Sequence, residues 1–222
     1  MPDYVYLPYN CKRFALDYKS TVRATKDLRH VVFLGDSILR STYCGHLYYT
    51  LHNGTIGGDC QFSSDWKSYQ KSDKTFEVKI DDGERQSVRF TQRFIDDHPE
   101  LAGPRIEDTK QYGASVSHVI TNLGMWFGYK SEHDYVAAVY QHLERLYTHF
   151  GNSPRYTWIN TYSVSAPVIC FGMMRRAVLR HHGEWAAIAI NAWIDRHPDV
   201  QINIIHSHQI VDSRPETASD GR

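Results

Sequence analysis

The chain has 222 residues, a length that fits one domain able to bury a substantial core without metal ions or a disulfide framework. Its 25 Lys and Arg residues balance its 25 Asp and Glu residues, and no basic run stands out, so we expect no nucleic-acid partner. No apolar leader and no apolar run of roughly 18 residues occurs, so we expect no membrane segment in these residues and a single domain over 1–222.

Short apolar runs alternate along the chain with segments of helical period. Residues 30–34 (HVVFL) are apolar and β-branched and end at Gly35, which is typical of a buried strand in a parallel sheet. Residues 37–51 then have a helical pattern, and residues 63–74, rich in Ser, Asp and Lys, indicate a loop. Further strands are indicated at residues 87–94, 117–123, 156–162 and 200–206.

The clearest predicted helix begins at Ser131 and ends at Gly151. Between these two residues, apolar side chains recur at helical spacing, at Tyr135, Val136, Val139, Tyr140, Leu143 and Leu146. Residues 173–196 predict one or two further helices.

Strands that alternate with helices imply an α/β fold: three layers around a doubly wound, mainly parallel sheet. Ligands of such sheets lie beyond the carboxyl ends of the strands. We therefore expect Ser37, Asn122, the residues after Tyr162 and those after His206 to gather at one edge.

Neither the cysteines nor the histidine pair predicts a metal site. The four cysteines have no CxxC pairing and no metal-ligand spacing, and they could form up to two disulfides; they are Cys11, Cys44, Cys60 and Cys170. His181 and His182 lack a carboxylate at ligand spacing, so we expect them on a solvated helix face. Asn53 begins an Asn-Gly-Thr sequon, which predicts an exposed position if the protein is secretory.

Ser37 stands where the first strand gives way to a helix. There it is either a helix cap or a nucleophile beside unpaired backbone N–H groups, and Asp36 could equally be the cap. Gly35 would let the chain turn sharply, and Asp36 could hold the turn by accepting hydrogen bonds from nearby N–H groups. The Gly-Asp-Ser triplet alone does not separate the two interpretations.

Longer blocks carry a family resemblance. "YVYLPYNCKRF" (4–14) followed by "HVVFLGDSILR" (30–40) resembles the opening of the PC-esterase group of SGNH/GDSL enzymes, which have a flavodoxin-like fold. That group includes the trichome-birefringence-like polysaccharide O-acetyltransferases and the lumenal domain of sialate O-acetyltransferases. "HVITNLGMWFG" (118–128) is similar to their Asn-x-Gly-x-Trp block, and "IVDSRPETASDGR" (210–222) is similar to their closing segment, which runs to an Asp-x-x-His.

The resemblance implies a role for each matching residue. Ser37 is similar to the nucleophile, which attacks an acyl carbonyl and becomes acylated. The backbone N–H of Ser37, one of Gly57 or Gly58, and Asn122 would form the oxyanion hole. Asp220 is similar to the acid that orients the catalytic histidine.

Other residues keep two interpretations. Arg40 could fix Asp36 or bind an anionic group of the substrate. Trp126 could form, with Phe127, an aromatic floor for a sugar, or the pair could be core or rim packing. Cys11 resembles a family cysteine that is commonly disulfide-bonded, and its partner is left open.

The sequence departs from the family pattern at the base. It ends at Arg222, one residue before the position of the expected histidine, and a serine without a base is a poor nucleophile. We prefer the interpretation that the chain is truncated there. The alternative bases are His206 and His208, which could equally be polar residues at a strand end.

These observations together predict a serine-nucleophile acyl-ester enzyme, with O-acetyl transfer to or from a carbohydrate through an acylated Ser37. The alternatives are a GDSL-type carboxylic ester hydrolase acting on carbohydrate or lipid, and a non-catalytic SGNH-like module that binds a glycan or a protein. We expect no cofactor, an acyl donor such as an acetyl ester or acetyl-CoA, and an acylated or acyl-accepting glycan or small ester as partner. The family, Asn53 and the cysteines favour the secretory pathway, in the Golgi lumen or outside the cell, with the cytoplasm as the alternative.

Overall fold

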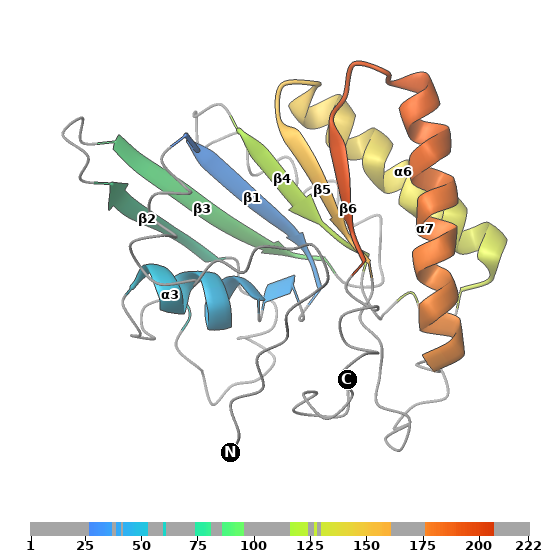
Figure 1. Ribbon diagram of the computed structural model, residues 1–222, viewed down its shortest axis with the longest axis horizontal. Helices are drawn as coiled ribbons and strands as arrows, with labels where there is room; N and C mark the ends of the chain where they lie inside the picture. The colour runs from blue at the N-terminus through green and yellow to red at the C-terminus, as the bar shows by residue number, and fades with distance from the viewer. Residues whose placement is uncertain are drawn as a thin grey trace, which may run out of the picture.

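A six-stranded sheet forms the centre of the computed structural model, with the strand order β2-β3-β1-β4-β5-β6 (Figure 1). The structure describes residues 27–36, 39–40, 42–52, 60, 74–80, 86–95, 116–123, 127, 130–160 and 176–206. The strands are β1 (His30–Gly35), β2 (Lys74–Ile80), β3 (Gln86–Phe94), β4 (His118–Thr121), β5 (Arg155–Ile159) and β6 (Ile202–Ile205). The helices are the π-helix η1 (Thr42–Tyr48) with the short α3 (Tyr49–Leu51), then α6 (Glu132–Phe150) and α7 (Arg176–Arg196).

The sheet is parallel except at one edge. Strand β1 pairs in parallel with both β3 and β4, and β5 and β6 continue in the same direction. The edge strand β2 runs antiparallel to β3. The predicted mainly parallel α/β sheet is therefore confirmed, whereas β2 was not predicted, although Phe76 and Val78 alternate with the exposed Glu77 and Lys79.

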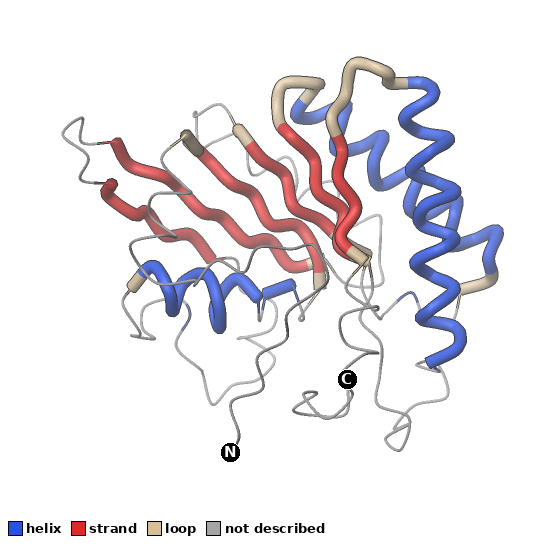
Figure 2. The backbone as a smooth tube through the Cα atoms, viewed as in Figure 1, coloured by secondary structure: helices blue, strands red, loops and turns tan. Residues whose placement is uncertain are grey.

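The two faces of β1 belong to different cores, which makes the molecule three-layered. Val32 and Leu34 pack in a cluster with residues of α6 and α7. Val31 and Phe33 pack in a second cluster with Tyr43 of η1. Figure 2 shows α6 and α7 on one side of the strands and the shorter helices along the other. A strand buried on both faces explains why HVVFL is continuously apolar.

The prediction of α6 is confirmed at both ends. The Ser131 hydroxyl oxygen accepts a hydrogen bond from the Asp134 N–H at 3.2 Å, as an N-cap does. Gly151 follows the last helical residue with a φ of 71°, a conformation that glycine adopts without strain.

No helix among the residues described is both long and apolar enough to cross a bilayer.

The expected solvated face of α7 is wrong for one of its two histidines. His181 is exposed, with its Nδ1 atom 3.0 Å from Glu184 Oε2. His182 is buried, and its ring stacks on Tyr135 of α6 with the ring centroids 4.0 Å apart. The correction has a simple cause, because adjacent residues of a helix lie about 100° apart and only the second faces α6.

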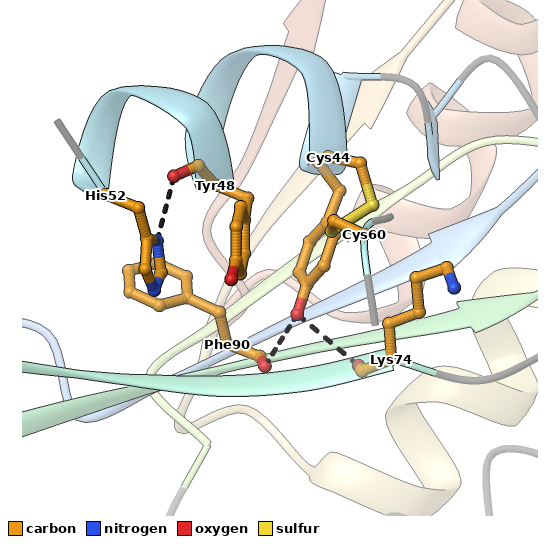
Figure 3. Close-up of a disulfide and its surroundings, with 7 residues drawn as sticks. Cys44, Tyr48, His52, Cys60, Lys74 and Phe90 are labelled. Carbon is orange, nitrogen blue, oxygen red and sulfur yellow. Dashed lines mark hydrogen bonds between the residues drawn. A yellow bond between two sulfur atoms is a disulfide. The ribbon is translucent and has the colours of Figure 1, made fainter. Parts of the chain in front are cut away.

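A tyrosine bonds the helical segment after β1 to two strands of the sheet, and a disulfide joins the same segment to Cys60 (Figure 3). Cys44 of η1 is bonded to Cys60. The Tyr43 hydroxyl donates a hydrogen bond to the Phe90 carbonyl of β3 at 2.9 Å, with the Lys74 carbonyl of β2 at 3.4 Å. The cysteine pairing that the sequence left open is thus settled for these two residues. Cys11 and Cys170 lie outside the described residues.

Candidate functional site at the carboxyl edge of the sheet

A polar residue directly follows each of the parallel strands β1, β4, β5 and β6. Asp36 follows β1, Asn122 follows β4, Asn160 follows β5 and His206 follows β6. Because parallel strands end at one edge, these four side chains belong to the same edge of the sheet. The first three are buried and His206 is exposed. This edge is the candidate site.

Asp36 and Asn122 hold each other through two hydrogen bonds. The Asp36 N–H donates to Asn122 Oδ1 at 3.1 Å, and Asn122 Nδ2 donates to Asp36 Oδ1 at 3.2 Å. Both residues are 1% exposed. A buried pair in which the acceptor and the donor of the amide are both used fixes the amide's orientation. The predicted approach of Asn122 to the end of β1 is therefore seen in the structure.

Asp36 also starts the helical turn that follows. Its Oδ1 atom accepts a hydrogen bond from the Leu39 N–H at 3.1 Å, and its carbonyl accepts one from the Arg40 N–H at 3.1 Å. A side chain that bonds the N–H three residues on, with a carbonyl that begins the helical bonding, is an N-cap. Of the two candidates for the cap, Asp36 therefore fills this role.

Gly35 is needed at this site for a reason that the sequence did not indicate. A Cβ atom on Gly35 would lie 2.0 Å from Asn122 Oδ1 and 2.7 Å from Leu39 Cδ2. Among the described glycines only Gly151 has a positive φ. Close approach of Asn122, and not the sharp turn we expected, therefore requires glycine at this position.

Asn160 is a site residue that sequence reasoning missed. Its Nδ2 donates to His206 Nδ1 at 3.0 Å, and its backbone N–H donates to the Ile205 carbonyl at 3.0 Å. The signal was present, since Asn160 follows an apolar run as directly as Asn122 does. The bond also indicates that His206 carries its ring proton on Nε2 when it is neutral.

The structure describes two of the residues that had two interpretations. Arg40 is 2% exposed, with its guanidinium carbon 5.6 Å from the centroid of the Phe94 ring, and both of its interpretations remain predictions. Phe127 is buried in the core cluster on the α6 face, as packing requires.

Six predicted site residues remain predictions because they lie outside the described residues: Ser37, Gly57, Gly58, Trp126, His208 and Asp220. In the part of the chain that is described, no three His, Cys, Asp or Glu side chains come together as a metal site.

The fold and this edge define an α/β protein with a polar, hydrogen-bonded site at the carboxyl ends of a mainly parallel sheet.

No family model matches the chain, and no curated protein matches it. Several solved structures are similar, and three of them are described in turn. A peptidoglycan O-acetylesterase is 10% identical, with 92% of this chain and 88% of that chain covered and a TM-score of 0.49. An acetylxylan esterase from Geobacillus stearothermophilus is 12% identical, with 87% and 85% covered and a TM-score of 0.47. A protein from Bacteroides fragilis described as a putative acylhydrolase is 13% identical, with 95% and 88% covered and a TM-score of 0.48.

Proposed function

We propose that this chain is a serine-nucleophile acyl-ester enzyme of the SGNH type, which transfers an O-acetyl group to or from a carbohydrate through an acylated Ser37. One observation carries the proposal. The buried Asp36 and Asn122 pair fixes the residue that directly precedes Ser37, at the edge where parallel sheets bind ligands. Since Asp36 caps the following turn, the hydroxyl of Ser37 is not needed to bond the Leu39 N–H.

Asn122 suits the role of oxyanion donor. Its Nδ2 carries two hydrogens, and one of them bonds Asp36 Oδ1, which leaves the second for an oxygen that becomes negatively charged. A donor that is already oriented and shielded from water does not have to reorganise during the reaction. Removal of one such donor typically costs about 3 kcal/mol of transition-state stabilisation.

The proposed reaction has two balanced steps. Ser37 Oγ attacks the acyl carbonyl while its proton passes to a base, the tetrahedral oxyanion is bonded by Asn122, and the alcohol leaves with that proton. Water or a sugar hydroxyl then gives a proton to the base and attacks the acyl group, and the base returns that proton to Ser37 Oγ as the bond to the acyl group breaks. Acetyl and carbohydrate are proposed from the resemblance of the opening and Asn-x-Gly-x-Trp blocks to the polysaccharide O-acetyltransferases.

We assign the base to the closing segment around Asp220 in preference to His206. In the sheet order β6 is three strands from β1, and at strand spacings of about 4.8 Å this is on the order of 14 Å. A base on His206, at the end of β6, would have to reach across this span to take the proton of Ser37, which follows the end of β1. His206 is moreover bonded to Asn160. The family's Asp-x-x-His pattern instead puts the histidine after Asp220.

Turnover of para-nitrophenyl acetate tests the proposal. The chain would be compared with Ser37→Ala and with two versions that carry one more residue after Arg222, either His or the matched control Ala. We expect Ser37→Ala to abolish turnover and the added His to exceed the added Ala. Addition of a neutral oligosaccharide should yield an acetylated sugar detectable by mass spectrometry. If Ser37→Ala, introduced into the version with the added His and still folded, leaves its turnover unchanged, the proposal is refuted.

A further inference from the structure

A second buried pair, Thr121 and His142, lies next to the Asp36 and Asn122 pair, since Thr121 directly precedes Asn122 in the chain. Thr121, the last residue of β4, has its Oγ1 atom 2.7 Å from the Leu34 carbonyl oxygen and 2.7 Å from Nε2 of His142 on α6. Thr121 is fully buried and His142 is 1% exposed. A hydroxyl has one proton and a carbonyl oxygen only accepts, so Thr121 donates to Leu34 and the His142 Nε2–H donates to Thr121.

This pair closes a ring of hydrogen bonds with the candidate site. The Leu34 carbonyl also accepts the backbone N–H of Asn122 at 3.2 Å, so Thr121, the last residue of β4, and Asn122, the next residue, bond the same oxygen of β1. Two residues further along β1's chain, Asp36 bonds the side chain of Asn122 in both directions. The backbone of Asn122 is thus held from Leu34 and its amide from Asp36.

His142, the donor from α6, keeps the same protonation state around neutral pH. Burial, with a smaller effect of the positive charge of Arg145, lowers the pKa of His142 to about 3. The imidazole is therefore neutral at neutral pH, and its protonated nitrogen is the one that faces Thr121. A neutral ring can be buried at this position without an ion-pair partner.

We propose that Thr121 and His142 are positioning residues that hold Asn122 in place for acyl transfer. The proposal rests on the proposed function, in which Asn122 stabilises the oxyanion. Neither residue touches the reacting atoms. They act through the Leu34 carbonyl oxygen, which accepts hydrogen bonds from both the Thr121 hydroxyl and the backbone N–H of Asn122.

The structure supplies a matched control at the opposite end of β1. His30, the first residue of β1, has its Nε2 atom 2.9 Å from Thr91 Oγ1 of β3, and both residues are fully buried. Burial and the nearby arginines lower the pKa of His30 to about 4, so it is also neutral at neutral pH. Thr91→Val therefore breaks a buried His-Thr hydrogen bond of the same kind, away from the candidate site.

Kinetics of Thr121→Val, Thr91→Val and Thr121→Ser test the proposal. Valine keeps the shape of threonine and removes the hydroxyl, so both valine variants should be destabilised to a similar degree. We expect only Thr121→Val to lower kcat, by about tenfold, because a displaced Asn122 amide loses part of its hydrogen bond to the oxyanion, with KM unchanged. Thr121→Ser, which restores the hydroxyl, should restore kcat. Unchanged kcat in Thr121→Val, an equal loss in Thr91→Val, or no recovery in Thr121→Ser would overturn the proposal.

A readout that does not depend on activity separates this proposal from the proposed function. The side-chain amide resonances of Asn122, assigned by NMR, should shift in Thr121→Val and stay in place in Thr91→Val. Resonances that do not move in Thr121→Val would overturn the positioning role even in an active enzyme. Full activity of Ser37→Ala would instead overturn the proposed function, while a selective shift of the Asn122 amide would still support its positioning by Thr121.

Discussion

Replacement of Gly35 by alanine should separate Asp36 from Asn122. The added Cβ would lie 3.0 Å from Asn122 Cγ and 2.0 Å from Asn122 Oδ1, and unbonded heavy atoms do not approach as closely as the second distance. The Asn122 side chain must therefore rotate away. Its two hydrogen bonds with Asp36 break as it does so.

The size of the effect follows from these contacts. Two buried hydrogen bonds contribute about 1 kcal/mol each, and the buried amide of Asn122 left unsatisfied costs about 1 to 3 kcal/mol more, whereas the Asp36 carboxylate keeps the Leu39 N–H. Displacement of packed atoms such as Leu39 Cδ2, 2.7 Å from the new Cβ, adds a smaller amount. We expect the free energy of unfolding to fall by about 3 to 5 kcal/mol.

Urea unfolding followed by circular dichroism measures this change. Gly151→Ala is the matched control, because no atom lies within 4 Å of its Cβ and only its positive φ of 71° opposes the substitution. It should cost about 1 kcal/mol. In an Asn122→Ala background Gly35→Ala should cost about 2 kcal/mol less, since the clash with Asn122 and its two bonds to Asp36 are already absent and only the clash with Leu39 is left. Equal costs of Gly35→Ala in both backgrounds would refute the reasoning.

Two further predictions concern stability. Reduction of the disulfide between Cys44 and Cys60, which are 16 residues apart, should lower the free energy of unfolding by about 3 kcal/mol, measured by urea unfolding with and without reductant; Cys44→Ser should then be insensitive to reductant. His182→Phe keeps the stack on Tyr135 and removes two buried ring nitrogens that have no hydrogen-bond partner among the described residues, so stability at neutral pH should be equal or higher. Burial lowers the pKa of His182 to about 4 from its ordinary 6.5, so the unfolded chain takes up this proton at a higher pH than the folded chain does. The protein with His182 therefore loses stability as the pH falls from about 6.5 to about 4. His182→Phe should make this loss shallower, by up to about 1.4 kcal/mol per pH unit, and an unchanged slope would contradict the assignment.

Elements with strong local signals could be predicted from the sequence. The run HVVFL is apolar throughout because β1 is buried on both faces, and α6 carries both its N-cap serine and its terminal glycine. Strand β2 was missed although Phe76 and Val78 alternate with Glu77 and Lys79. Its antiparallel pairing with β3 at the edge of a parallel sheet, by contrast, is a property of the assembled sheet and not of its own seven residues.

The site could be predicted in part for the same reason. Asn122 was identified from its block, yet nothing local shows that its amide bonds Asp36 in both directions or excludes a side chain at Gly35. The bond between Thr121 and His142 joins residues 21 positions apart on a strand and a helix, and only their packing reveals it. Asn160, by contrast, follows its strand as Asn122 does and could have been found.

The central claim is that Ser37 is an acyl-accepting nucleophile beside the Asp36 and Asn122 pair. Labelling with a fluorophosphonate probe, followed by peptide mapping by mass spectrometry, tests it most directly. The chain, and the version with one added histidine, should carry a single adduct on Ser37 that is absent from folded Ser37→Ala and weakened in Asn122→Ala. Adducts on other residues only, or no adduct on Ser37 in either folded chain, would contradict the account.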